Sequence, residues 1–452
     1  MTVAVLLWIG SCAGRWAPSA AGALPAWMAL AAAAVLLGRH RSLYAVVFVL
    51  GVSGGAREWS AGQVVPGDCS GTVRVVEDPR AFGPATSLVV DLGAGRVRAY
   101  GYGSAGARLA RLSAGQHVRL DGTCAPVSKD RRARELVAHV TGRMTVTAVG
   151  ENIGDGGALW RGANRVRSLI LRGTRHMPAD DAALFAGLVI GDDRNQPRTM
   201  VEEFRASGLS HLCSVSGQNV VYVMAAFSVF LRRLRPLARF LASLAVIAWF
   251  VVLTRAEPSV LRAAAMASVV AFNFFRGRAA NGRQVLAVSV VVLLLVDPML
   301  AFSIGFALST GATAGLAWVS RPLAQRLHLP AVLATTVAAQ LGTLPVAALV
   351  FRRVSIISLV ANPIAVPVAG AVMLAGIPCA LVAAVTPDPV SVPLQWAMLV
   401  PTRFVAVVAE TGARMAPHGV FAVMCWLLVF AIAGVRWSMT RVSGRVGEWP
   451  PT

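Results

Sequence analysis

The sequence predicts a polytopic α-helical membrane protein with one small all-β domain inserted near its N-terminus. Of its 452 residues, 56% are hydrophobic and only 14% are charged, a balance that is rare in a soluble protein of this length. Apolar runs long enough to cross a bilayer, about 17–25 residues each, recur through the second half of the chain. A single hydrophilic stretch, residues 56–157, interrupts this pattern and carries strand-like alternation.

Residues 1–55 are expected to form N-terminal transmembrane helices. Apolar segments occupy residues 3–14, 18–37 and 43–55, and a basic cluster, Arg39-His40-Arg41, lies between the last two. Because basic residues gather on the cytoplasmic side of the inner membrane, this cluster places the following domain outside the cytoplasm.

Residues 56–157 are expected to form an extracytoplasmic β domain. Apolar and polar residues alternate in five short runs, and Gly or Pro separates them; the runs cover residues 72–76, 87–91, 96–100, 117–120 and 136–149. Five short strands in about a hundred residues suit a small OB-like barrel. Such barrels often bind single strands, although a fold alone does not establish a function.

Of the six cysteines, Cys69 precedes the first predicted strand of this domain and Cys124 follows the fourth. Outside the cytoplasm a disulfide between them would persist and stabilise the domain. Two free, buried thiols are the alternative. The other four cysteines lie in or near apolar segments and are expected to be inert. No Cys or His spacing suggests a metal site, and no cofactor is expected.

Residues 158–178 mix Trp, Leu and Ile with Arg, which indicates an amphipathic helix in the membrane interface. Its basic face is expected to meet lipid phosphates, with DNA phosphates as the alternative. Residues 179–436 are almost wholly apolar and allow about nine crossings. Residues 437–452 form a basic tail. Nearly all basic clusters then fall on the cytoplasmic side, as does the C-terminus, whereas Arg352-Arg353 fall outside. The net charge of +21 fits this rule and also fits an electrostatic path for a polyanion.

Four motifs within residues 179–436 depart from plain apolar helix. One of them, residues 297–312, begins with Asp297-Pro298 and has glycines inside an apolar run. Residues 207–220 place hydroxyls, a histidine and two amides at the entrance of an apolar run, where they suggest a lined cavity or, for the small residues, close helix packing. Glu257 and Arg262 frame Pro258, which suggests a paired intramembrane charge or a structural bridge. Gln340 and Asn362 precede Pro345 and Pro363 in kinked helices. The candidate path residues are His211, Ser214, Ser216, Gln218, Asn219, Glu257, Arg262, Gln340 and Asn362.

Together the motifs resemble those of the ComEC family of competence proteins. They appear in the family's order: Gly-Asp at 191–192, Gly-Leu-Ser-His-Leu with Val-Ser-Gly at 208–217, Pro-Ser-Val-Leu-Arg-Ala at 258–263, Asp-Pro with Gly-Phe-Ala-Leu-Ser at 297–309, Gln-Leu-Gly-Thr-Leu-Pro at 340–345 and Asn-Pro at 362–363. Gln218-Asn219 stand where Leu-His is usual. The resemblance implies an inner-membrane channel for uptake of single-stranded DNA in natural transformation.

The resemblance also implies partners, namely an outer DNA receptor, a cytoplasmic ATPase or helicase, and a separate nuclease. Many members carry a C-terminal metallo-β-lactamase-like domain, and this sequence is expected to represent a form without it, because its seven histidines are scattered. We therefore expect no enzymatic activity and no catalytic residue. The alternatives are a small-molecule or ion transporter and an intramembrane hydrolase using Ser214 or Ser216 with His211, which lacks an Asp to orient the histidine.

Overall fold

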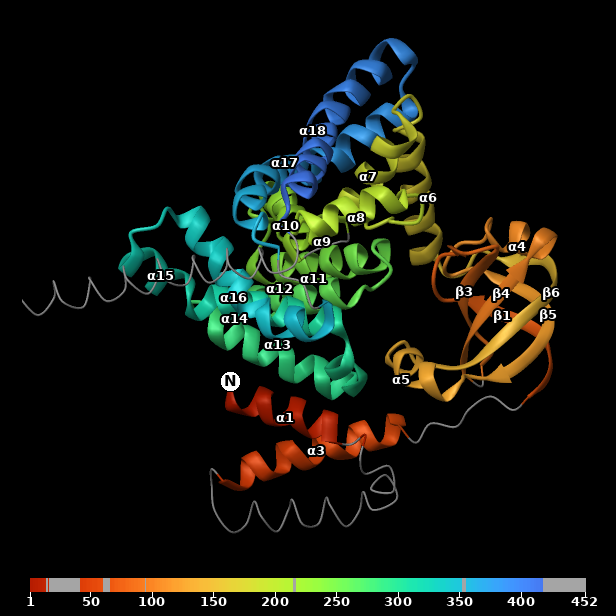
Figure 1. Cartoon of the computed structure of the whole chain (residues 1–452), viewed down its shortest axis with the longest axis horizontal. Helices are drawn as coiled ribbons and strands as arrows, with labels where there is room; N and C mark the ends of the chain where they lie inside the picture. The colour runs from red at the N-terminus through yellow and green to blue at the C-terminus, as the bar shows by residue number, and fades with distance from the viewer. Residues whose placement is uncertain are drawn as a thin grey trace, which may run out of the picture. The chain divides into compact units, whose positions relative to one another are not determined.

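The computed structural model describes residues 1–13, 15, 41–59, 66–93, 95–213, 217–351 and 355–417 (Figure 1). The chain divides into two compact units. The first unit is Met1–Leu169 with Phe227–Phe306, and the second is Ile170–Ala226 with Ala307–Thr452.

A six-stranded mixed sheet in the first unit forms the inserted β domain. The strands are β1 (Gly67–Val75), β2 (Arg80–Phe82), β3 (Ala85–Asp91), β4 (Arg96–Tyr102), β5 (His117–Pro126) and β6 (Val140–Gly154). They pair in the order β1-β5-β6-β4-β3-β2, and β1 also pairs with β3. Five strands therefore close into a barrel, and β2 only extends β3. Every pairing is antiparallel except β4 with β6. This arrangement confirms the prediction of an OB-like domain.

Alternating side chains build the core of the barrel. Val97 and Ala99 of β4 are fully buried, as are Val118 and Leu120 of β5, while the residues between them are partly or fully exposed. A period of two is what a strand with one face on the core requires. The same period in the sequence had predicted these strands.

The disulfide Cys69–Cys124 is present, which confirms the predicted bridge. Its Cα atoms are 5.7 Å apart, and the bond closes a loop of 55 residues. The two cysteines lie inside neighbouring strands, β1 and β5, and not just outside the first and fourth predicted strands, as expected from the sequence. The bridge therefore ties together two strands that are already paired.

The last strand, predicted from residue 136, begins later in the structure. Leu136 belongs to a helix, α5 (Lys129–Val137), and β6 begins only at Val140. The segment before Leu136 is rich in Arg, Ala and Glu, which favour helix, and the alternation in this region hid that preference. A second short helix, α4 (Gly103–Leu109), joins β4 to β5.

The helices of the first unit pack beside one another with several close backbone approaches. They are α1 (Thr2–Ala13), α3 (Arg41–Trp59), most of α6 (Ala158–Arg172), α11 (Pro236–Leu253), α12 (Pro258–Phe275), α13 (Gly282–Val296) and the 3-10 helix η3 (Pro298–Phe302). A Cβ on Gly55 would lie 2.3 Å from the carbonyl oxygen of Ser11, so only glycine lets α3 approach α1 this closely. The predicted segment 18–37 lies outside the described residues.

The second unit is wholly helical in its described part. It contains α7 (Ala179–Ile190), α8 (Arg198–Ala206), α9 (Ser210–Cys213), the start of α10 (Gly217–Leu231), most of α14 (Ile304–Trp318), α15 (Ser320–Leu327), α16 (Ala331–Phe351), α17 (Ser358–Val385) and α18 (Asp388–Met415). The basic tail, residues 437–452, lies outside the described residues.

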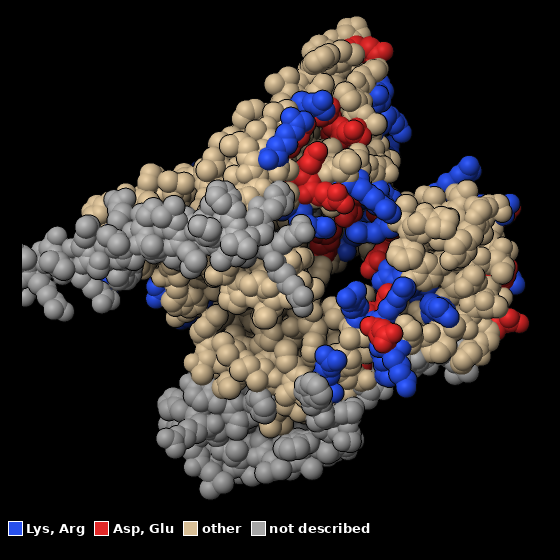
Figure 2. Space-filling model, viewed as in Figure 1, with Lys and Arg blue, Asp and Glu red and all other residues tan. Residues whose placement is uncertain are grey.

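Five helices are long and apolar enough to cross a bilayer: α11, α12, α16, α17 and α18. The shorter apolar helices are α1, α10 and α13. Many large hydrophobic side chains on the long helices are exposed, such as Leu349 of α16, at 82%, and Val385 of α17, at 73%. On the face shown in Figure 2, uncharged residues cover most of the helical part. Exposed apolar surface on long helices is the mark of lipid contact, and the chain is a multi-pass membrane protein.

Candidate functional site

The structure distributes the predicted path residues between the two units. The second unit holds His211, Gln218, Asn219, Gln340 and Asn362, and the first unit holds Glu257 and Arg262. Ser214 and Ser216 lie outside the described residues. The second unit therefore carries the larger group of candidates.

The first motif of the second unit turns the chain sharply at Gly208. Its φ is 77°, in the left-handed region that favours glycine. A Cβ there would lie 2.5 Å from the Cβ of Ser358, so glycine also permits close packing on α17. The hydroxyl of Ser355 donates to the carbonyl oxygen of Ala206 at 2.7 Å. The turn between α8 and α9 therefore packs directly on the start of α17.

Gln340 and Ser358 meet beside that turn. The amide of Gln340 on α16 contacts the hydroxyl of Ser358 on α17. Asn362 lies one turn after Ser358, and residues four apart share a helix face. The structure therefore brings Gln340 and Ser358 together beside the turn at Gly208, and Asn362 lies on the same face of α17 as Ser358. We call Gln340, Ser358 and Asn362 the amide cluster.

The oxygen atoms of the two amides are left without partners. The Oε1 atom of Gln340 and the Oδ1 atom of Asn362 are buried, and neither has a hydrogen-bond partner among the described residues. A buried polar atom without a partner costs free energy, and in a native protein it needs a physical explanation. The cluster is neutral, polar and incompletely satisfied.

Helices α14 and α16 touch through their backbones. A Cβ on Gly315 would lie 2.0 Å from the carbonyl oxygen of Ala338, and one on Gly342 would lie 2.1 Å from that of Gly311. Small residues that let two helices touch through their backbones are a common device in membranes. Gly311 and Gly315 thus pack α14 directly on α16, the helix that carries Gln340 on its opposite face.

The other polar residues of the opening motif have different surroundings. The side chain of Asn219 is 3% exposed and donates to the carbonyl oxygen of Leu188 on α7 at 2.9 Å, so one of its roles is to join two helices. The side chains of His211 and Gln218 are exposed. His211 follows the turn that packs on α17, which keeps it a candidate for a path.

The Gly-Asp element supports the same corner of the second unit. Gly191 ends α7 with φ 68°, and Asp192, 4% exposed, pairs with Arg194 at 2.5 Å. The side chain of Gln196 lies 3.5 Å from the carbonyl oxygen of Cys213. These contacts hold the loop after α7 near the end of α9.

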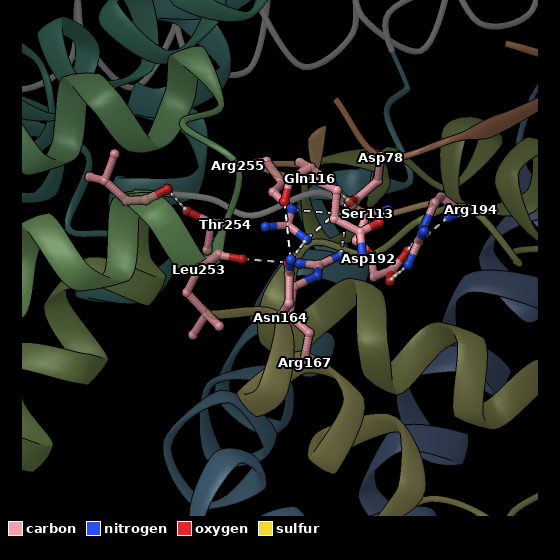
Figure 3. Close-up of polar contacts among 12 residues, drawn as sticks. Asp78, Ser113, Gln116, Asn164, Arg167, Asp192, Arg194, Leu253, Thr254 and Arg255 are labelled. Atoms are coloured by element: carbon pink, nitrogen blue, oxygen red, sulfur yellow. Dashed lines mark hydrogen bonds and ion pairs between the residues drawn. The ribbon is translucent and has the colours of Figure 1, made fainter. Parts of the chain in front are cut away.

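The first unit contains a buried ion cluster that the sequence did not predict (Figure 3). Asp78, between β1 and β2, accepts two bonds of 2.9 Å from Arg255, and Arg167 of α6 lies 3.3 Å away. The backbone N–H of Ala114 also donates to Asp78 at 2.9 Å. Such charge-assisted bonds are about twice as strong as neutral ones. The Asp78 cluster joins the barrel, α6 and the turn between α11 and α12.

Arg255 occupies a strained position in this cluster. Its φ is 62°, and that of Ala256 is 55°. The N–H of Ala256 bonds to the carbonyl of Val251 at 2.8 Å, a helix end that usually carries glycine. Each such residue costs about 1–2 kcal/mol. Contacts to Asp78, to Asn164 at 2.7 Å and to the Trp160 ring at 5.6 Å offset that cost.

Glu257 and Arg262 lie on the same turn and helix as Arg255. Glu257 immediately precedes α12, and its carbonyl accepts the N–H of Leu261 at 2.9 Å. Arg262 is 6% exposed, and its guanidinium lies 3.1 Å from the sulfur of Met266. The motif thus joins a strained, ion-paired turn to a buried arginine on a candidate membrane span.

A second link joins the barrel to the membrane helices. The ring of His139, after α5, lies 3.1 Å from Asp297 and 3.4 Å from Glu58. Asp297 begins the Asp-Pro motif and also accepts the N–H of Met299 at 2.9 Å. Its hydrogen bond to the ring raises the pKa of His139, and the charge of Glu58 adds to this effect.

Three aromatic residues of the β domain share one surface. Phe82 and Tyr100 meet edge to face with ring centroids 5.7 Å apart, and Phe82 and Tyr102 are each 54% exposed. Trp59 lies elsewhere, at the end of α3, against Phe302 at 5.2 Å. The exposed aromatic surface thus comes from β2 and β4.

Metal-binding residues do not cluster in the described part of the chain, where no group of three or more His, Cys, Asp or Glu could hold an ion. The amide cluster and the Asp78 cluster contain no such group.

Comparison with known proteins places the chain in a family. The model of the family described as "Competence protein" matches residues 188–443, more than half of the chain. ComE operon protein 3 of Bacillus subtilis (strain 168) is 31% identical over 196 residues, which are 42% of this chain and 25% of that protein. The chain thus spans about a quarter of the length of this curated relative. No solved structure matches it. The matched region contains Glu257, Arg262 and the entire amide cluster, and the chain belongs to the Competence protein family.

Proposed function

We propose that this protein is an inner-membrane channel that passes single-stranded DNA into the cell during natural transformation. The observation that carries the proposal is the family match over residues 188–443, because that region contains the amide cluster and the turn of Arg255. Family membership implies a role in DNA uptake. The substrate form, the path and the direction are the parts that we propose.

The polar surfaces of the chain suit a polyanion. DNA phosphates need positive charge for attraction, but tight binding would trap the strand. The chain supplies a net charge of +21, and the amide cluster supplies neutral polar atoms on membrane helices. We infer that arginines draw the strand and that neutral groups, including His211, Gln218, Gln340 and Asn362, let it move on.

The barrel would receive the strand first. Phe82, Tyr100 and Tyr102 form an exposed aromatic surface, and the side chain of Arg80 on β2 is also exposed. Bases stack on aromatic rings with little sequence preference. The second and third barrel strands, which are β3 and β4 here, form a usual binding face of this barrel type. We place the barrel outside the cytoplasm, where its disulfide would persist, and the C-terminus inside.

The channel would work with other proteins and without chemistry of its own. An outer receptor would deliver DNA, a separate nuclease would remove one strand, and a cytoplasmic ATPase or helicase would draw the other inward. In this proposal no residue of the chain is catalytic. Transport of a small molecule or ion is the competing function.

Uptake of labelled DNA in a deletion strain tests the proposal. We expect the deletion to abolish entry of label into the cytoplasm and the full chain to restore it. His211→Ala and Arg262→Ala should each lower uptake roughly tenfold, the effect of a barrier about 1.4 kcal/mol higher. His328→Asn is the control, because His328 is exposed and has φ 50°, which Asn tolerates.

Two results would contradict this function. Undiminished DNA entry in the deletion strain would exclude the channel and leave the small-molecule transporter. A normal rate with both His211→Ala and Arg262→Ala, at normal protein levels, would remove these residues from the path.

A further inference from the structure

The exposed side of α6 carries a row of arginines. Arg161, Arg165 and Arg172 are exposed, and Ser168, which is also exposed, lies among them. Intervals of four, three and four residues keep these side chains on one side of a helix. From Arg161 to Arg172 the helix rises by about 16 Å. We call these four residues the arginine ridge.

The positive charge of the ridge is not balanced by acids on the same helix. Residues 158–178 contain five arginines and no acidic residue. Arg161 lies near the carboxylate of Asp155, which offsets part of its charge. Arg165 and Arg172 form no ion pair with any residue that the structure describes. These two guanidinium groups are therefore available to a ligand.

The rest of the α6 surface packs on protein of the first unit. A Cβ on Gly115 would lie 2.6 Å from the Cβ of Trp160, and one on Gly162 would lie 2.8 Å from the ring of Trp249 on α11. Ala163 is fully buried. The helix is thus held by the barrel and by α11, and the ridge is the side that it leaves open.

This packing favours water over lipid as the surroundings of the ridge. A helix that lies in a membrane interface needs a continuous apolar face to enter the bilayer. The exposed large apolar side chains of α6 are Leu159, at 60%, and Leu171, at 36%. Twelve residues separate them, which rotates one from the other by about 120° around the helix. Helix α6 therefore has no continuous apolar face left for lipid.

A row of cations that faces water matches the backbone of a nucleic acid strand. Arginine donates in-plane hydrogen bonds to phosphate oxygens. With a rise of about 3.4 Å per nucleotide, the ridge is as long as about five nucleotides. We propose that the arginine ridge binds the phosphate backbone of a single DNA strand and guides it along α6. The choice of a DNA strand as the ligand rests on the proposed function.

Binding of fluorescent oligothymidine to the purified full chain in detergent tests the ridge. Anisotropy would give the association constant at several salt concentrations. Arg165→Gln combined with Arg172→Gln should weaken binding roughly tenfold at low salt. The plot of log association constant against log salt should become less steep by about 1.4, because each lost phosphate contact of a single strand removes about 0.7. The Tm should stay unchanged, since both side chains are exposed.

Arg276→Gln combined with Arg278→Gln is the matched control. Both arginines are exposed and follow α12, so this variant loses the same charge at another place. It should keep the affinity and the salt dependence of the unmodified chain. Equal losses in the two double variants would overturn the proposal, because net charge alone would then explain the binding. Unchanged binding in the ridge variant, or no binding by the unmodified chain, would also overturn it.

A lipid arm separates the two sources of phosphate. Phosphatidylglycerol, with phosphatidylcholine as its neutral counterpart, would be added during thermal unfolding. If the ridge variant binds oligothymidine normally but loses a phosphatidylglycerol-dependent rise in Tm, the ridge faces lipid and the proposal is wrong. DNA uptake in the deletion strain decides the proposed function separately. Lost uptake in that strain, together with unchanged oligothymidine binding by the ridge variant, would reject the ridge alone.

Discussion

The Asp78 cluster of the first unit and the amide cluster of the second unit solve the problem of buried polarity in opposite ways. Asp78 is charged and saturated, with two bonds from Arg255 and one from Ala114. Gln340 and Asn362 are neutral and keep one free oxygen each. The comparison teaches that charge is concentrated where the barrel and a strained turn must be held, whereas neutral, unsatisfied groups lie where a ligand could be exchanged.

The largest expected effect on the free energy of unfolding comes from removing the negative charge of Asp78. Asp78→Asn would leave Arg255 and Arg167 buried without that carboxylate, which should lower the free energy of unfolding by about 3–5 kcal/mol. Thermal unfolding of the purified protein measures this loss. Asp91→Asn is the control, because its pair with Arg74 is partly exposed and should contribute less than about 1 kcal/mol. Equal losses would refute a special role for the Asp78 cluster.

Loss of the disulfide should have the next largest effect on the free energy of unfolding. Replacing Cys69 and Cys124 together by serine should cost about 2–4 kcal/mol, because the bond restricts a long loop of the unfolded chain. The same unfolding measurement applies, with Cys379→Ser, a free thiol in the second unit, as the control.

Alkylation provides an independent check of the bridge. Cys69 and Cys124 should take up a thiol reagent only after reduction and unfolding. Labelling of both without reductant would show that the pair is not bonded in the cell.

Gln340→Leu should separate stability from function. The substitution removes an unpaired buried acceptor together with one hydrogen bond, so the two contributions nearly cancel and the unfolding free energy should change by less than about 1 kcal/mol. DNA uptake should nevertheless fall roughly tenfold if the amide lines the path. A variant as unstable as Asp78→Asn would instead make the amide cluster a structural support.

The smallest effect is expected at His139. Its pKa is raised, chiefly by the hydrogen bond to Asp297 and further by Glu58, while burial and the charge of Arg96 lower it. The stabilisation is therefore present below the normal histidine pKa and is lost as pH rises through the raised value. It should stay below about 1 kcal/mol because the side chains are partly exposed. Unfolding at several pH values should show this slope, and His139→Gln should remove it.

The sequence predicted most elements because their signals are local. Alternation in Val118 and Leu120 marks a strand wherever the strand lies, and the length of an apolar run marks a membrane helix. The prediction that the last strand begins at Leu136 was wrong, because helix-forming residues and an alternating pattern overlap in this short stretch. Arg255 was missed because it ends a helix at a position where glycine is the usual signal, and its partner Asp78 lies 177 residues away.

The candidate path residues also divide into features that the local sequence predicts and features that depend on distant contacts. The motifs identified Gln340 and Asn362 as unusual, because amides and prolines are costly in an apolar helix. Their meeting with Ser358 and the turn at Gly208 could not be predicted, since it depends on how helices from distant segments pack. His211 stays a prediction, and Ser214 and Ser216 lie outside the described residues.

The sequence by itself determined the multi-pass class, the barrel strands and the family, since hydropathy, period and motif order are properties of short segments. Only the tertiary structure decided which polar groups are satisfied. Asp78 finds its arginines, and Gln340 and Asn362 are left with free oxygens, because hydrogen bonding inside a protein depends on the positions of atoms from several elements at once.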